Sequence, residues 1–196
     1  MKKGTGKAKG GSFERSVAKS LSLWLSNNTN DSVFWRSAMS GGRATLGEKE
    51  GNLRKTQSGD LSAIHSLGES FLDTFYVELK FYKDLNIESF LLNNKGNLAQ
   101  FWKEAVVEAA KYSKIPLLIA KQNRKPVLII TTLEGAEVFD LDNNDDMFDY
   151  TNTVFPIGLS ISDHDETLGH EIAVGFYDRL LEIADPKVFT EEIVDG

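Results

Sequence analysis

The sequence contains no cysteine, and this absence excludes disulfide bonds and thiolate zinc sites. It also lacks any apolar run near the roughly 18 residues needed to span a bilayer. The first residues are basic but no apolar stretch follows them, so they do not resemble a secretory signal. Neither a P-loop nor a G-x-S-x-G nucleophile motif is present. We therefore expect a soluble, cytoplasmic protein with no membrane partner.

Basic residues are scarce toward the C-terminus and concentrated toward the N-terminus. The net charge is −7, yet residues 1–55 carry 11 Lys/Arg against 4 Asp/Glu, whereas residues 126–196 carry 2 against 17. This division predicts a basic surface for a polyanion and an acidic segment with a different task, such as binding a basic protein partner. Acidic residues that merely solvate a C-terminal surface are the alternative.

The length of 196 residues and an apolar content of 41% indicate a globular protein with a substantial core. Hydrophobic periodicity predicts helices and strands in alternation. In chain order we expect a helix over 12–26, a strand over 33–38, a hairpin over 58–82, helices over 86–92 and 97–111, and strands over 115–120 and 126–131. The expected fold class is therefore α/β, with a central mixed β-sheet flanked by helices.

Three segments are expected along the chain. Residues 1–11 are predicted to be a basic flexible arm, residues 12–133 the main domain, and residues 134–196 an acidic C-terminal extension packed on it. Within the extension we expect an edge strand at 137–139, a strand over 153–161 and a helix over 171–184.

The expected hairpin brings candidate catalytic residues together. Side chains alternate along a strand, so Glu78 and Lys80 share one face while Leu79 points into the core. A turn centred on Glu69 would set Asp60 opposite Glu78, with Cβ atoms roughly 4.5–5.5 Å apart. Because facing carboxylates repel, a divalent cation between them is expected: Mg²⁺, with Mn²⁺ as a substitute.

The pattern Asp60…Glu78-Leu79-Lys80 resembles the motif of the PD-(D/E)xK nuclease superfamily, whose fold is that of the restriction endonucleases. Within it, the order of elements is similar to that of the archaeal-type Holliday junction resolvases over about residues 7–131. The segments that carry this resemblance are Lys9–Arg15, Trp35–Gly42, Gly59–Ala63 and Val77–Lys80. The family more often has proline where this chain has Gly59, and usually a shorter loop before it.

The resemblance implies a metal-dependent endodeoxyribonuclease that acts on branched DNA and leaves 5′ phosphates. Asp60 and Glu78 would bind the metal, with Glu14 reaching the same site from the first helix. Lys80 would position or deprotonate the attacking water or steady the phosphate, and Ser37 would contact the scissile strand. The alternative for Glu14 is that it only interacts favourably with the helix dipole and has no role in catalysis. A homodimer is implied as well.

Basic residues outside this motif are expected to contact the DNA backbone. They are Lys7, Lys9, Arg15, Arg36, Arg43, Arg54, Lys55 and Lys121. The alternative for the N-terminal arm is a tail that only increases solubility. The alternative for Lys121 is a side chain that is simply solvated.

Three other functions remain open. The chain could be a different PD-(D/E)xK nuclease of the restriction, repair or packaging type. It could be a non-catalytic DNA-binding or assembly module, although an intact Asp60, Glu78 and Lys80 argues against that. It could also be an interaction protein whose acidic segment mimics nucleic acid. The Asp, Glu and His residues of 163–171 are read as a solvated loop rather than a metal cluster, and His65 as structural.

Overall fold

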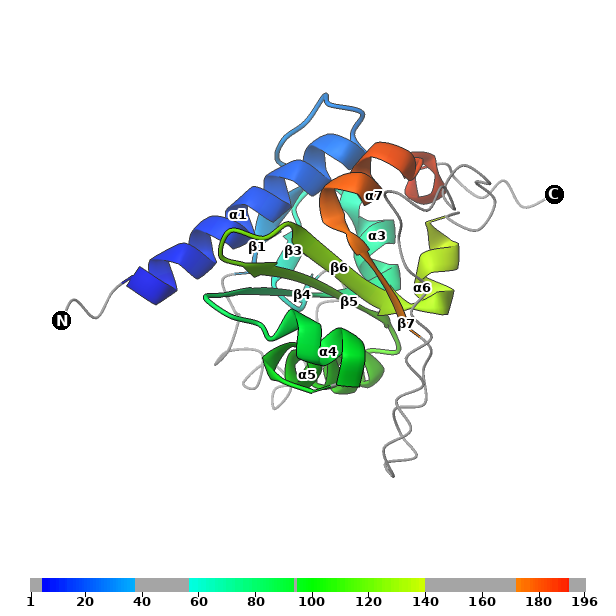
Figure 1. The fold of residues 1–196 in the computed structure, drawn as a ribbon. Helices are drawn as coiled ribbons and strands as arrows, with labels where there is room; N and C mark the ends of the chain where they lie inside the picture. Colours follow the sequence, from blue (N-terminus) through cyan, green and yellow to red (C-terminus); the bar gives the residue numbers. More distant parts are fainter. Residues whose placement is uncertain (1–4, 38–56, 94, 140–171, 191–196) are drawn as a thin grey trace, which may run out of the picture. The chain divides into compact units, whose positions relative to one another are not determined.

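The chain forms two compact units, drawn together in Figure 1. Unit 1 comprises residues 1–77 and 185–196, and unit 2 comprises residues 78–184. The computed structural model describes residues 5–37, 57–93, 95–139 and 172–190.

The described part of unit 1 consists of a long helix, a small antiparallel sheet and three short helical segments. The sheet has the strand order β1-β3-β2, with Arg36 opposite Leu61 and Ser58 also opposite Leu61. Its elements are α1 (Thr5–Leu25), β1 (Phe34–Arg36), β2 (Gln57–Ser58), β3 (Leu61–Ala63), η1 (Ser66–Gly68), α3 (Glu69–Thr74) and η3 (Pro186–Phe189). The strand predicted over 33–38 is thus confirmed as β1.

An aromatic cluster centred on Phe71 forms the core of unit 1. The rings of Trp24, Phe34, Phe75 and Phe189 lie with their centroids 5.1–6.3 Å from that of Phe71. Tilted and edge-on contacts of this kind add to the free energy gained by removing the rings from water. Segments far apart in sequence are therefore held together by a few aromatic side chains.

The first helix begins earlier than predicted. It starts at Thr5 rather than Ser12, so the residues expected to form a flexible arm up to Gly11 are helical from Thr5 onward. Its buried apolar side chains begin at Phe13, as the periodicity indicated. Once that face is anchored, each further residue adds one hydrogen bond, although Gly6, Gly10 and Gly11 are poor helix formers. The helix therefore extends beyond its apolar stripe.

The predicted hairpin is wrong. The segment between β3 and β4 (Phe75–Tyr82) contains η1 and α3, and Gly59 bridges Val77 in parallel rather than antiparallel orientation. Phe71 and Leu72 are both fully buried, which adjacent residues of a half-exposed strand cannot achieve but a helix can. Gly68 marks close packing rather than a hairpin turn, because a Cβ there would lie 2.7 Å from the Phe34 ring.

Unit 2 is built on a mixed four-stranded sheet in the order β4-β5-β6-β7. Leu118 pairs with Ile130, and Ile130 with Val174, in antiparallel ladders. The last residues of β4, from Glu78, belong to this unit. The other elements are α4 (Ile87–Asn93), α5 (Asn97–Lys111), β5 (Ile115–Gln122), β6 (Val127–Thr132), α6 (Leu133–Val138), β7 (Ile172–Phe176) and α7 (Tyr177–Ile183). The helices predicted over 86–92 and 97–111 and the strands over 115–120 and 126–131 are confirmed.

The core of unit 2 lies between the sheet and the helices α4 and α5, which cover one face of it (Figure 1). Trp102 of α5 is almost fully buried there. Ile172 and Val174 of β7 join the same core. The sheet and its covering helices thus form a layered α/β unit, as predicted.

The C-terminal part differs from the expected extension. Residues 133–138 form the helix α6 instead of an edge strand at 137–139, and Thr132 caps it by accepting a hydrogen bond from the Gly135 N–H at 3.1 Å. The helix predicted over 171–184 divides into β7 and α7. Val174 and its neighbours in β7 are buried against β6, so sheet pairing overrides the helical period. The strand predicted over 153–161 lies outside the described residues.

None of the described helices combines the length and the apolar character that crossing a membrane requires.

Candidate active site

In unit 1, Asp60 is held by backbone hydrogen bonds on both sides. Its N–H donates to the Val77 carbonyl at 2.8 Å, and its carbonyl accepts from the Ser37 N–H at 2.7 Å. The residue is only 9% exposed. An ionised carboxyl group so deep in a protein must be compensated by partners or by a cation, because its desolvation is costly.

Gly59 makes this position possible. Its φ of 72° is in the left-handed region, and a Cβ there would lie 2.0 Å from the Val77 carbonyl oxygen. Only glycine fits such an approach. Proline, whose ring holds φ near −65°, cannot adopt it. The Gly-Asp sequence at this point thus has a steric reason.

In unit 2, Glu78 and Lys80 lie on one face of β4 as predicted. The Lys80 ammonium is 2.5 Å from Glu78 Oε1, and both side chains are about one-fifth exposed. The same ammonium lies 5.1 Å from the centroid of the Phe101 ring on α5, within cation–π range. Leu79 between them is buried, as predicted.

Glu14 is paired within unit 1. Its Oε2 lies 3.2 Å from Arg36 Nε, but the contact lacks hydrogen-bond geometry, and this buried oxygen has no hydrogen-bond partner. Ser37, predicted to contact the scissile strand, is buried and borders residues outside the described part of the chain. A carboxylate oxygen without a hydrogen bond is a potential ligand for a hard cation.

The predicted catalytic residues are divided between the units. Unit 1 holds Glu14, Ser37 and Asp60, and unit 2 holds Glu78 and Lys80. Val77, whose carbonyl accepts the hydrogen bond from the Asp60 N–H, immediately precedes Glu78 in the chain. Among the residues described, no group of three or more acidic or histidine side chains is assembled for a metal ion. A shared metal site stays a prediction.

A family model described as "Phage putative PDDEXK endonuclease" matches residues 5–188. The chain belongs to this nuclease family. No curated protein and no solved structure matches it. The family match extends through β7 and α7, so it includes the acidic C-terminal part that the resolvase resemblance left outside.

The basic residues predicted to bind DNA have varied placements in this PDDEXK family member. Lys9 and Arg15 are exposed on α1, whereas Arg36 is engaged with Glu14. Lys121 is partly exposed on β5. Lys7 lies in α1, but its side chain is outside the described set, and so are the residues Arg43, Arg54 and Lys55.

Sequence reasoning did not propose Trp35 as a functional residue. Trp35 is 62% exposed and lies between the buried Phe34 and the half-buried Arg36. The alternation of faces along β1 was the available signal: a buried Phe34 turns the next side chain outward. A hollow of about 390 Å³ lies beside it in unit 1.

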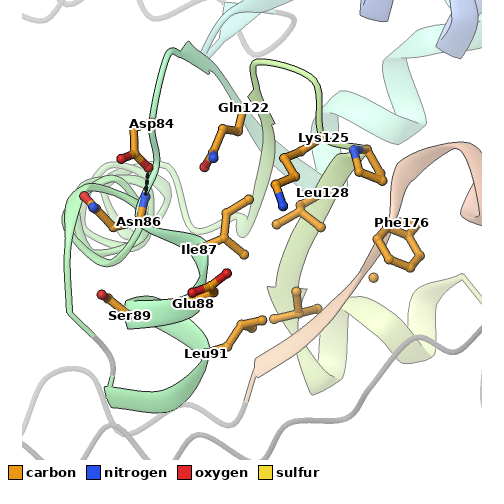
Figure 2. A pocket seen from close by; sticks show the side chains of 13 residues that line it. Asp84, Asn86, Ile87, Glu88, Ser89, Leu91, Gln122, Lys125, Leu128 and Phe176 are labelled. Atoms are coloured by element: carbon orange, nitrogen blue, oxygen red, sulfur yellow. Dashed lines mark hydrogen bonds between the residues drawn. The ribbon is translucent and has the colours of Figure 1, made fainter.

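A second hollow, of about 490 Å³, lies in unit 2. Figure 2 shows Gln122 and Lys125 on one side of it, with Ile87 below them and Phe176 across from them. Gln122 is oriented by the Leu85 N–H, which donates to its Oε1 at 3.0 Å. Neither Glu78 nor Lys80 lines this hollow, so it is distinct from the Glu78–Lys80 pair.

Proposed function

We propose that the chain is a metal-dependent endodeoxyribonuclease in which Asp60, Glu78 and Lys80 carry the chemistry. The observation that supports this most is the hydrogen bond from the Asp60 N–H to Val77, the residue directly before Glu78. It ties the backbone of one motif residue to the strand that bears the others. The intact Glu78–Lys80 pair is the second support.

The residues suit a hard divalent cation. Carboxylate oxygens of Asp60 and Glu78 and the Leu79 carbonyl are the ligands that Mg²⁺ prefers, and Mn²⁺ is a substitute. The buried Glu14 Oε2 lacks a hydrogen bond and is a further oxygen donor. When bound, the cation would polarise the phosphate and stabilise the charge on the leaving 3′ oxygen.

The chain's own groups then have separate tasks. Lys80 keeps a positive charge beside the scissile phosphate or accepts a proton from the attacking water. Glu78 orients the Lys80 ammonium through their ion pair. The nearly buried Asp60 sits on a backbone fixed at both ends, which limits the reorganisation needed when substrate binds.

Branched DNA cut by a homodimer is the finer form of the proposal, and it rests on the resemblance to the archaeal-type resolvases. Linear, flapped and single-stranded DNA are the alternative substrates of this nuclease family. A twofold dimer carries two equivalent sites, so it would cut two opposed strands of a four-way junction at symmetric positions.

The proposal is tested by incubating the protein with labelled four-way, flapped and duplex DNA in Mg²⁺, with and without EDTA. We expect Asp60→Asn and Lys80→Ala to lose about 10²–10⁴-fold in cleavage rate while largely retaining DNA binding. EDTA should abolish cleavage and added Mn²⁺ should restore it. The substrate cut fastest by the parent protein identifies the DNA class.

Two exposed residues provide matched controls. Asp73→Asn on α3 and Lys83→Ala just after β4 make the same chemical changes at the surface and should cleave at the parental rate. If Asp60→Asn cuts DNA as fast as the parent, the site assignment is wrong. Binding without cleavage by the parent in Mg²⁺ and in Mn²⁺ would favour the non-catalytic DNA-binding module.

A further inference from the structure

The hollow beside Trp35 in unit 1 has the charge of a polyanion site. It lies between α1 and β1, and its charged lining residues are three cations, Arg15, Lys19 and Arg36, and one anion, Asp31. Lys19 is paired with Asp31 at 3.1 Å, and Arg36 Nε lies 3.2 Å from Glu14 Oε2, so these three cations and two anions leave one net positive charge. We call this cavity, lined by Trp35 and these charged residues, the Trp35 hollow.

Trp35 offers an open aromatic face at the hollow. The other two tryptophans of the chain, Trp24 and Trp102, are 8% and 1% exposed, whereas Trp35 is 62% exposed. A single exposed apolar residue needs no explanation. An exposed indole beside two guanidinium groups is different, because aromatic faces flanked by cations are how proteins bind single nucleic-acid strands.

The two arginines converge on a helix position that has no side chain. Arg36 Nη1 and Arg15 Nη1 lie 2.8 and 3.6 Å from the point that a Cβ of Gly11 would occupy. Glu14 contacts the Nε side of Arg36, and the Nη1 atom of Arg36 packs against the buried Gly11. Nearby guanidinium groups repel each other, and the Glu14 carboxylate offsets part of this repulsion at Arg36. A phosphate that contacts both arginines would accept charge-assisted hydrogen bonds from them.

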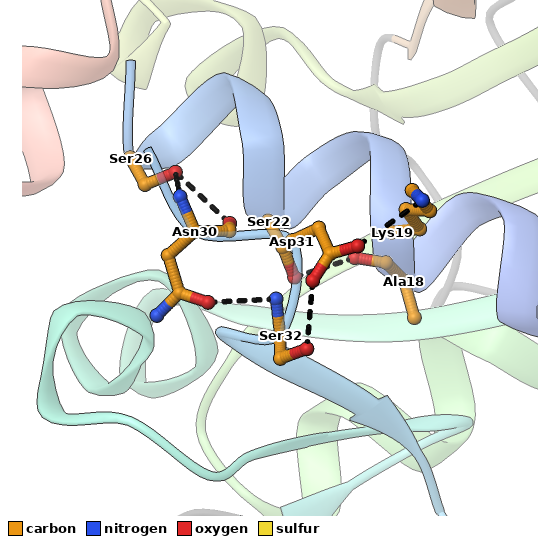
Figure 3. A network of polar contacts seen from close by, with 7 residues as sticks. All are labelled: Ala18, Lys19, Ser22, Ser26, Asn30, Asp31 and Ser32. Atoms are coloured by element: carbon orange, nitrogen blue, oxygen red, sulfur yellow. Dashed lines mark hydrogen bonds and ion pairs between the residues drawn. The ribbon is translucent and has the colours of Figure 1, made fainter. Parts of the chain in front are cut away.

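The hollow is held in shape by a local polar network (Figure 3). The Ser22 hydroxyl donates to the Ala18 carbonyl at 2.7 Å and accepts the Phe34 N–H at 2.8 Å, which fixes β1 against α1. Asp31 binds Lys19 and accepts from the Ser32 hydroxyl at 3.0 Å. The neighbours of Trp35 are therefore ordered before any ligand binds, which reduces the entropy lost on binding.

We propose that the Trp35 hollow binds one nucleotide of a DNA strand, with its phosphate between Arg15 and Arg36 and its base stacked on Trp35. The base must be unpaired, because bases inside a duplex have both faces covered by their neighbours. The ligand being DNA rests on the proposed nuclease function. The substrate class that follows is DNA with a single-stranded or splayed segment.

The test uses the full chain in EDTA, where binding is observed without cleavage, and follows intrinsic tryptophan fluorescence. A short single-stranded oligodeoxynucleotide should quench the emission saturably, because Trp35 is the exposed tryptophan. Trp35→Leu should abolish the quenching and weaken binding about tenfold, the value of one base–aromatic stack. Trp35→Tyr, which retains an aromatic face, should keep most of the affinity.

Alanine substitutions at the adjacent glycines Gly10 and Gly11 distinguish a lost phosphate contact from the effect of adding a methyl group to the helix. Gly11→Ala places a methyl group 2.8 Å from Arg36 Nη1, so the guanidinium group must shift. The variant should reduce the salt dependence of single-strand binding by about 0.7 in log–log slope, the value of one phosphate contact. Gly10→Ala adds the same methyl group one residue earlier, where its nearest atom is Glu14 Oε1 at an ordinary 3.7 Å, and should bind like the parent.

Three results would overturn the inference. The first is quenching that persists in Trp35→Leu, and the second is equal quenching by a fully paired duplex. The third is displacement of the oligonucleotide by an oligoglutamate peptide that binds as tightly as the oligonucleotide does. Because no cleavage is measured, the outcome is separable from the nuclease assignment. A chain that cleaves DNA but shows no Trp35 quenching would lose only this inference, and one that quenches but never cleaves would lose only the nuclease proposal.

Discussion

Lys80 contacts both a carboxylate and an aromatic ring within unit 2. Its ammonium lies 2.5 Å from Glu78 Oε1 and 5.1 Å from the centroid of the Phe101 ring. Tyr82 in turn packs on Phe101 with centroids 4.8 Å apart. If Glu78 also binds a cation, its hold on Lys80 weakens, and the ring becomes the partner that keeps the ammonium in place.

Phe101→Leu should therefore lower the maximal cleavage rate about 2- to 30-fold with little change in KM for DNA, since a cation–π contact contributes about 0.5–2 kcal/mol. Phe101→Tyr keeps the ring and should keep the rate. Steady-state kinetics on the fastest-cut substrate measure both. Equal rates for the Leu and Tyr variants would show that the ring has no part in positioning Lys80.

Asp31 gives the ion pair with Lys19 a pH dependence. The hydrogen bond from Lys19, together with that from Ser32, lowers the pKa of Asp31 below its ordinary value. A lowered pKa means that the pair stabilises the fold above the ordinary carboxyl pKa and loses this contribution as the pH falls through the lowered one.

The difference in unfolding free energy between the parent and Asp31→Asn should consequently be constant from neutral pH down to about pH 4 and shrink below it. The difference will be small because both side chains are more than half exposed. Chemical denaturation at a series of pH values measures it. A difference that stays unchanged at the lowest pH would rule out this pair as its source.

At the scale of elements, the isolated bridge between Gly59, which precedes β3, and Val77 of β4 decides where Asp60 lies. Gly59 bridges Val77 in parallel, and the chain reaches that position through η1 and α3. A parallel approach requires such a crossover, whereas a short turn permits only antiparallel pairing. The buried Phe71 and Leu72 of α3 supply the helix that makes the crossover.

Gly59→Ala should destabilise unit 1 by about 1–3 kcal/mol, because it combines a strained φ with a clash against the Val77 carbonyl oxygen. Gly10→Ala is the matched change inside α1 and should be neutral or stabilising by up to about 1 kcal/mol. Thermal and urea denaturation give both values. Equal stability of the two variants would refute the steric role of Gly59.

At the scale of the whole molecule, the C-terminal segment is part of the fold. Strand β7 pairs with β6 and contributes Ile172 and Val174 to the core of unit 2. Burying each such side chain stabilises a protein by about 1.5–3 kcal/mol. Against a total stability of about 5–15 kcal/mol, the loss of a whole core strand is severe.

A chain that ends after Phe139 should therefore fail to fold cooperatively, contrary to what a dispensable acidic extension would show. The milder Val174→Ala should lower the free energy of unfolding by about 1–3 kcal/mol, while Val188→Ala, at a residue 45% exposed, should change it by less than about 0.5 kcal/mol. Urea denaturation followed by circular dichroism measures each. A cooperative transition in the shortened chain would contradict the role of β7.

Whether residues 140–171 form a separate acidic surface for a basic partner stays a prediction, because these residues lie outside the described part of the chain.

The amino-acid sequence alone determined the elements whose side-chain pattern is strong over many residues, such as α5, β5 and β6. It also predicts Asp60, Glu78 and Lys80 as motif residues. These are local properties, since propensity and periodicity act between near neighbours in the chain. Only the tertiary structure decided the parallel contact of Gly59 with Val77, the strand state of residues 172–176 and the exposure of Trp35 beside two arginines. Each depends on which distant segment is packed alongside, and local spacing does not specify that partner.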